Sequence, residues 1–331
     1  MSLWRMMGLY VGGVIGAGFA SGQELAVFFV SYGRTGLWGI LAAFLVLTLG
    51  SGLVLGCCIR TNASSYQQIF AALDPRLSRI CDLIYTSFLL VGLSVMLAGI
   101  GAMGTTAFRG LLFRLATSIL ILAVLQRGVE GAAKAGGWLA PLMVLIISAF
   151  AFYSLGRHGL APLKSGSWRA VEAGILYGSY NLGFSLAILA SVQRYVRTKR
   201  ERWKLALGGN LVLGLCMVLL FLALSALDAE QLNTSFPLRG IVAELGFAGA
   251  AAYELLLWAA MFSTATAHAL ALANRLAEDV GLSWMQGASL VLLVSLGLSY
   301  AGFAALVRIA YPILGLAGLW ILAALVRERI V

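Results

Sequence analysis

The sequence predicts an all-α polytopic membrane protein with ten transmembrane helices, of which the first and the sixth are broken. The first observation is the composition: 61% of the residues are hydrophobic and 11% are charged, about half the charged fraction of a soluble domain. The second is a succession of apolar segments long enough to cross a bilayer. The third is that glycines interrupt two of these segments, five spans apart. This spacing predicts two halves of opposite orientation.

The predicted spans each hold about 20 apolar residues. They lie at 4–30, 36–59, 80–104, 108–126, 136–156, 169–193, 204–226, 248–273, 284–301 and 303–326. We therefore treat 1–331 as a single transmembrane domain, with repeat one at about 4–156 and repeat two at about 169–326. Two shorter helices are predicted outside the membrane, at 66–77 and 236–245. The second is expected to cap the outer side.

The distribution of basic residues predicts the orientation. With a cytoplasmic N-terminus, fifteen Lys and Arg residues fall on the inner side and six on the outer side. Cytoplasmic loops carry the excess of positive charge in membrane proteins, so both termini are expected in the cytoplasm. The basic run 194–204 is expected to face anionic lipid. The net charge of +10 therefore indicates the lipid bilayer as a partner, and not nucleic acid.

The first span is predicted to open near its middle. Six glycines and a carboxylate lie within 8–24, and each interior glycine costs a helix about 1 kcal/mol relative to alanine. Non-helical backbone is tolerated at this depth only where it is buried in protein or lines a polar cavity. Free N–H groups near Gly18 to Gly22 would suit a substrate carboxylate, and free carbonyls near Gly12 and Ile15 would suit a cation. The substrate residues expected here are Gly16, Ala17, Gly18, Phe19, Ala20, Ser21, Gly22 and Glu24.

The sixth span repeats this pattern between 173 and 184, with a break expected near 179. Paired interruptions in the two halves of a transporter point to its substrate site. The aromatic faces there suit an apolar side chain or an ammonium group. Close helix packing is the alternative use of the same glycines. The candidate substrate residues are Tyr177, Ser179, Tyr180, Asn181 and Phe184.

Two strings in the first span carry a resemblance to known families. The string 15–24 resembles the signature of the bacterial YkvI-type membrane proteins, and 14–19 resembles the glycine motif of the amino acid–polyamine–organocation (APC) superfamily. The resemblance implies the LeuT fold, in which two inverted five-helix repeats give alternating access to a midplane site. It also implies a location in the bacterial cytoplasmic (inner) membrane.

The eighth span carries hydroxyls that resemble the sodium ligands of Na⁺-coupled LeuT-fold transporters. Na⁺ is a hard cation that prefers oxygen ligands. The alternative is that these hydroxyls bond their own helix. Proton-coupled relatives place a lysine in the fifth span, and 138–155 holds none, which favours Na⁺; no other cofactor is expected. The predicted sodium ligands are the carbonyls of Gly12, Ile15 and Ala260 and the hydroxyls of Ser263 and Thr264.

Glu24 is an ionisable residue inside the membrane, where such residues are usually functional. It is expected to bind an amine substrate, to accept a proton, or to pair with Arg109 or Arg114. The roles of Glu254 and Arg308 stay open, and His268 is interpreted as a packed helix residue.

The function expected is a secondary active transporter of a small amino acid or a related zwitterion or amine, coupled to Na⁺. One alternative is a nutrient-sensing receptor subunit of the same fold, and another is an H⁺-coupled or exchange transporter that uses Glu24. An enzyme is not expected, because the chain has only two histidines and no nucleophile–base set. An amino acid, a betaine and an amine all remain candidate substrates.

Overall fold

The computed structural model describes residues 1–73, 78–161, 166–234 and 236–301, together with Leu319, Ala323 and Arg327. Within these residues the regular elements are all helices. In the part of the chain that the structure describes, seven helical segments are long and apolar enough to cross a membrane, and Trp284–Leu298 is a shorter apolar helix. Most of the predicted tenth span, Arg308 included, lies outside the described residues, so the count of ten spans stays a prediction.

The helices follow the predicted spans closely. They are α1 (Leu3–Val14), α2 (Ala17–Ser21), α3 (Gln23–Phe28), α4 (Gly36–Thr61), α5 (Tyr66–Leu73), α6 (Ser78–Ala102), α7 (Ala107–Leu125), α8 (Gly128–His158), α9 (Arg169–Val192), α10 (Lys199–Leu224), α11 (Ala229–Leu232), α12 (Leu238–Val242), α13 (Gly246–Asp279) and α14 (Trp284–Leu298). Short 3₁₀ turns lie at Val30–Thr35, Gln193–Tyr195, Ala243–Leu245 and Ser299–Ala301. The fifth span differs most, because α8 begins eight residues before the predicted 136.

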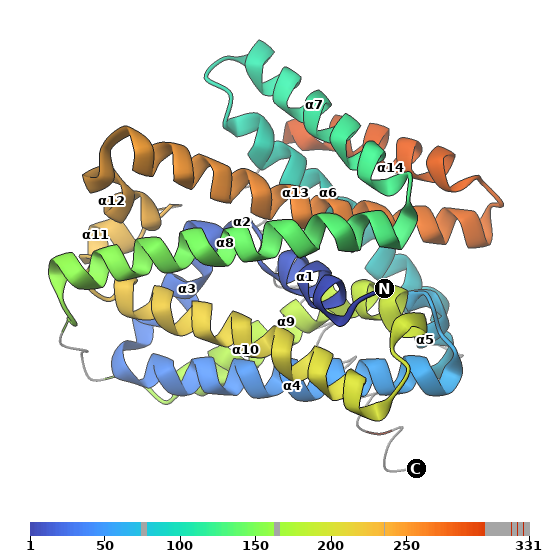
Figure 1. Ribbon diagram of the computed structural model, residues 1–331, viewed down its shortest axis with the longest axis horizontal. Coiled ribbons are helices and arrows are strands. Elements are labelled where there is room, and N and C mark those ends of the chain that lie inside the picture. The colour runs from blue at the N-terminus through green and yellow to red at the C-terminus, as the bar shows by residue number, and fades with distance from the viewer. Residues whose placement is uncertain are drawn as a thin grey trace.

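The long helices α4, α8, α10 and α13 run lengthwise, with α1 among them (Figure 1). The short helix α5 lies at one end and α11 and α12 lie at the other (Figure 1). We refer to these as the α5 end and the α12 end. Short polar residues fix several helix starts: Thr106 caps α7, Thr198 caps α10, and Ser283 forms a capping box with Gln286 at α14. Such caps satisfy backbone N–H groups that have no partner within the helix.

The predicted break in the sixth span is wrong, because α9 is a continuous helix from Arg169 to Val192. Its glycines serve close packing against α4 instead. A Cβ atom at Gly174 would overlap the backbone carbonyl of Gly39, and one at Gly178 would lie 2.8 Å from Val46 Cβ. Glycine is therefore required here because α4 and α9 pack closely together, and not because the chain opens.

Candidate functional site

The first span is interrupted, as the sequence predicts, between α1 and α2. The N–H of Gly16 donates to the carbonyl of Val14 at 2.8 Å instead of to Gly12, four residues back. Gly16 itself is extended (φ −87°, ψ −174°) and is the N-cap of α2. The backbone N–H groups at the start of α2 therefore lie around Ala17, one residue earlier than the predicted Gly18. The carbonyls of Gly12 and Gly13 lie in the last turn of α1, which ends at Val14.

A second interruption follows at Gly22. Its φ of 83° places it in the left-handed region, which glycine adopts without the steric cost that other residues pay. The hydroxyl of Ser21 donates to the carbonyl of Gly18 at 3.1 Å and accepts from the N–H of Gln23 at 3.3 Å. Ser21 is thus engaged in the local turn. Phe19 and Ala20 are buried in the core.

Glu24 lies in the first turn of α3, with only 8% of its surface exposed. Its side chain folds back over Gly18: a Cβ atom added at Gly18 would lie only 2.7 Å from Glu24 Cδ. The two arginines suggested as partners make other contacts. Arg109 donates to Thr105 Oγ1 at 3.1 Å, and Arg114 donates to the carbonyl of Leu97 at 3.3 Å and lies over the ring of Tyr300.

Ser263 and Thr264 of α13 face the open end of α1. Thr264 Oγ1 donates to the carbonyl of Gly13 at 3.5 Å and lies 3.8 Å from where a Cβ at Gly16 would be. A Cβ at Gly12 would overlap Ser263 Oγ. The carbonyl partner of Thr264 is therefore Gly13, which the sequence did not single out. Hydroxyl and carbonyl oxygens from two elements meet here, and this donor chemistry fits a hard cation.

The other two predicted sodium ligands are also buried. Ile15 and Ala260 each have 0% of their surface exposed. Ile15 is the C-cap of α1, and Ala260 lies one turn before Thr264 in α13, on the same helix face. By contrast, Thr266 donates to the carbonyl of Phe262 in its own helix at 2.7 Å. Within one turn of α13, the hydroxyl of Thr264 therefore bonds another element, whereas the hydroxyl of Thr266 bonds its own helix.

The predicted residues of α9 form one aromatic face. Tyr177 and Tyr180 contact Phe28 of α3, with ring centroids 5.4 and 5.8 Å apart. The ring of Phe184 lies 6.1 Å from Tyr180 and continues this face toward the α5 end. Asn181 donates to the carbonyl of Tyr177 in its own helix at 3.0 Å. The hydroxyl of Ser179 is buried and has no hydrogen-bond partner among the residues that the structure describes.

Two contacts fix how α9 lies against the first span. On the α1 side of the interruption, a Cβ at Gly13 would overlap Ile188, and on the α3 side Phe28 meets Tyr177 and Tyr180. The turn from Tyr180 to Phe184 lies between these two levels, as does the α1–α2 interruption on the facing element. The structure therefore brings the two predicted groups of substrate residues to the same level of the molecule.

A residue that sequence reasoning missed forms hydrogen bonds with the backbone of α9. Tyr85 of α6 donates from its hydroxyl to the carbonyl of Gly183 at 2.6 Å and accepts from the N–H of Ala187 at 3.4 Å. These two backbone groups are four residues apart and would normally bond to each other. A side chain that inserts in this way is a known cause of helix bending. No local sequence signal marks Tyr85 for this role.

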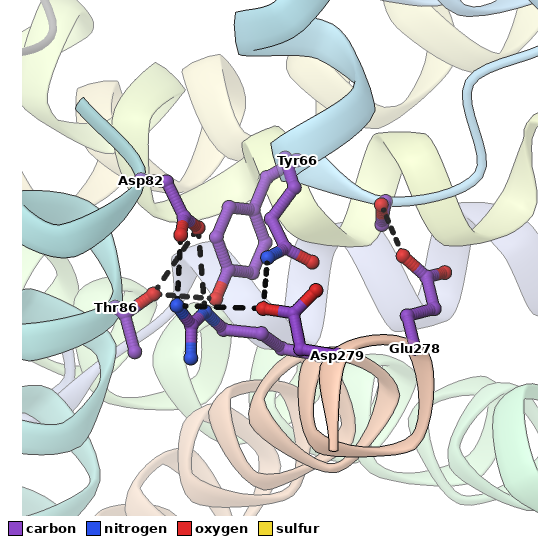
Figure 2. Close-up of polar contacts among 8 residues, drawn as sticks. Tyr66, Asp82, Thr86, Glu278 and Asp279 are labelled. Carbon is purple, nitrogen blue, oxygen red and sulfur yellow. Dashed lines mark hydrogen bonds and ion pairs between the residues drawn. The ribbon is translucent and has the colours of Figure 1, made fainter. Parts of the chain in front are cut away.

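A polar network lies at the α5 end (Figure 2). Arg275 of α13 pairs with Asp82 of α6 at 2.8 Å, and the hydroxyl of Tyr66 in α5 bonds Thr86 at 2.8 Å. Burial raises the pKa of the Tyr66 phenol above its ordinary value. Gln67 donates to Asp279 at 2.8 Å (Figure 2). These bonds join α5 to α6 and α13 and give Asp82 a structural role.

Two surface grooves lie away from the interruption in the first span. One, of about 330 Å³, includes Trp4, Pro141 and Val212. The other, of about 370 Å³, includes Glu254 and Trp258. Neither is lined by a predicted substrate or sodium residue. Most of the predicted substrate and sodium residues are instead buried, and Glu254 belongs to an outer wall between α6, α7 and α13.

No protein-family model matches the chain. It is 26% identical over 335 residues to the membrane protein YkvI of Bacillus subtilis (strain 168), covering 97% of this chain and 94% of YkvI. It is 25% identical over 332 residues to the protein YyaD of the same organism, covering 98% of this chain and 97% of YyaD. Both similarities extend over nearly the whole length of this chain and of each relative.

The fold is similar to solved structures of low sequence identity. MhsT in complex with L-phenylalanine has a TM-score of 0.73 at 18% identity, covering 98% of this chain and 88% of MhsT. A Na⁺-coupled sialic acid symporter has a TM-score of 0.68 at 13% identity, covering 98% and 78%. The nucleobase-cation-symport-1 family transporter Mhp1 has a TM-score of 0.59 at 14% identity, covering 89% and 70%. The chain is thus a multi-pass membrane protein homologous to YkvI, with the helical fold of LeuT-type transporters.

Proposed function

We propose that the protein is a secondary active transporter of a small amino acid or a related zwitterion or amine, coupled to Na⁺. The observation that carries this proposal is the meeting of the open end of α1 with the Ser263 and Thr264 hydroxyls, at 3.5 Å from Thr264 Oγ1 to the Gly13 carbonyl. Among the structural neighbours, the Na⁺-coupled symporter supports the coupling ion, and the L-phenylalanine complex supports an amino acid as substrate. The bacterial inner membrane, with the α5 end in the cytoplasm, is part of the proposal.

The cation has a defined role in this account. It would bind the carbonyls in the last turn of α1 and the two hydroxyls of α13, and so add ligand bonds between two elements that also share the 3.5 Å hydrogen bond from Thr264 to Gly13. A bound cation beside the start of α2 would also favour a substrate carboxylate there, because opposite charges attract strongly where water is excluded. Binding of cation and of substrate would therefore be coupled.

The substrate would lie between the first span and α9. Its carboxylate would accept hydrogen bonds from the N–H groups at the start of α2 around Ala17, where the positive end of the helix lies. The remainder would lie against the aromatic face of Tyr180 and Phe184. Alternating access would expose this position first at one end of the molecule and then at the other.

A second candidate is coupling to protons through Glu24. The specific observation is that this carboxylate is 8% exposed and lies over Gly18, beside the interruption. A buried carboxyl group that takes up a proton during the cycle would make uptake depend on pH and not on Na⁺. Replacing Glu24 with glutamine would then abolish proton-driven uptake, whereas in the Na⁺-coupled account it leaves the response to Na⁺ in place.

The test of Na⁺ coupling is binding of radioactive Na⁺ to the purified protein. We expect Ser263→Ala combined with Thr264→Ala to abolish saturable binding, since two of the oxygen ligands are removed. The matched control is Thr266→Ala in the same helix, whose hydroxyl bonds its own backbone and whose loss should leave Na⁺ binding unchanged. Normal Na⁺ affinity in the double variant would overturn the assignment.

A further inference from the structure

His268 is a buried polar residue that the proposed mechanism does not use. It lies in α13, and only 2% of its surface is exposed. Neither Nδ1 nor Nε2 has a hydrogen-bond partner among the residues that the structure describes. Buried polar groups are nearly always hydrogen-bonded, and leaving one without a partner is costly. The imidazole is thus the kind of group that a bound molecule completes.

The surroundings of His268 are aromatic and tightly shaped. Its ring stacks on Phe184 of α9, with centroids 5.3 Å apart and planes at 9°, and it meets the ring of Phe88 of α6 at 6.5 Å. A Cβ at Gly92 would lie 2.5 Å from His268 Cε1 and 2.7 Å from Nδ1. Glycine at this position of α6 therefore leaves the space that the imidazole occupies.

The position of His268 links it to the proposed site. It lies four residues after Thr264, so the two share one face of α13 one turn apart. Thr264 contacts the end of α1, and the stacking partner Phe184 belongs to the aromatic face proposed to hold the substrate. His268 is thus one helical turn from the proposed cation position and in direct contact with the proposed substrate wall.

We infer that His268 recognises a neutral hydrogen-bonding group on the substrate's side chain, such as an amide or a hydroxyl. This inference rests on the proposed function and names the substrate class of that same site. A neutral imidazole offers one donor and one acceptor, so it can bond either group. The neighbouring aromatic rings favour a neutral group, because bringing a charged one among them carries a large desolvation cost. A purely hydrocarbon side chain would leave the imidazole unpaired.

The test compares pairs of amino acids that differ only in polarity at nearly constant shape. The probes are tyrosine with phenylalanine, threonine with valine, and asparagine with leucine, each titrated against the purified protein in NaCl. We expect the polar member of at least one pair to bind about tenfold or more tightly, as for a hydrogen bond whose loss leaves a buried group unsatisfied. In His268→Phe, which keeps the stacking on Phe184, the two members should bind within about threefold of each other. His268→Asn, which restores a donor and an acceptor, should regain part of the preference.

The control is His158→Phe, because His158 is the other histidine and pairs with Glu244 at the far end of α8. It should keep the preference of the unaltered protein. Equal binding within every pair by the unaltered protein would overturn the inference without any variant, even if His268→Phe fails to fold. A polar preference that persists in His268→Phe would overturn it as well. If no amino acid, betaine or amine binds at all, the proposed function fails instead, so the two failures are distinguishable.

Discussion

The first and the sixth spans carry similar sequences but differ in structure. Both place glycines and small polar residues inside an apolar helix, yet the first span is divided at Gly16 and again at Gly22, whereas α9 is continuous. The difference lies in what faces each glycine. Gly12 and Gly16 face the side-chain hydroxyls of Ser263 and Thr264, whereas Gly174 faces the backbone of Gly39.

An intramembrane glycine therefore has two distinct structural uses. Where side-chain oxygens lie opposite, the helix can end and its carbonyls can bond elsewhere, as at Gly13. Where another helix backbone lies opposite, the helix continues and the missing side chain allows close approach. The partner element, and not the glycine itself, decides between the two.

The largest effect is expected from Gly174→Ala. The added methyl group overlaps the carbonyl of Gly39 in the packed core between α4 and α9, and such overpacking costs about 1–3 kcal/mol or more. A lower melting temperature of the purified variant is the expected result. Gly156→Ala in α8 is the matched control, because the structure places nothing within 4 Å of its Cβ position. Equal stability of the two variants would contradict the packing role of α9.

A smaller effect is expected from Gly22→Ala in the first span. The residue has a φ of 83°, and an L-residue with a side chain pays about 1–2 kcal/mol in the left-handed region. Its Cβ would also lie 3.2 Å from Leu224 and Leu238. We expect a moderate fall in melting temperature, which Gly22→Asn partly restores because asparagine tolerates this conformation. No difference between the alanine and asparagine variants would argue against a backbone cause.

The smallest effect is expected from Tyr85→Phe, which removes the hydroxyl between Gly183 and Ala187. The carbonyl and the N–H can then bond each other, so the loss should be at most about 1 kcal/mol. The readout is amide hydrogen exchange, in which Ala187 should become better protected. Slower exchange at Ala187 would sharpen the comparison, since it would identify a point where α9 is held partly open. Faster exchange would mean that Tyr85 supports the helix instead.

Much of the fold follows from hydrophobic segment length and from helix caps. The bounds of α4, α6 and α7 lie within about two residues of the predicted spans, because apolar runs and capping residues are local signals. The interruption of the first span also agrees with the sequence, whereas the sodium-binding role of Ser263 and Thr264 stays a prediction. The continuity of α9 was not predictable, because it depends on the Gly39 backbone, which lies far away in the chain. The same holds for Tyr85, whose partner groups belong to α9, and for His268, which was interpreted as a packed residue.

The measurement that tests the central claim most directly is a thermal-shift screen of the purified protein. It compares amino acids, betaines and amines in NaCl and in choline chloride. A ligand that binds only the folded state raises the melting temperature in proportion to its occupancy. The account predicts that at least one compound stabilises the protein in NaCl and has little effect in choline chloride. Equal stabilisation in both salts would contradict Na⁺ coupling at the open end of α1 and would move the coupling role to Glu24.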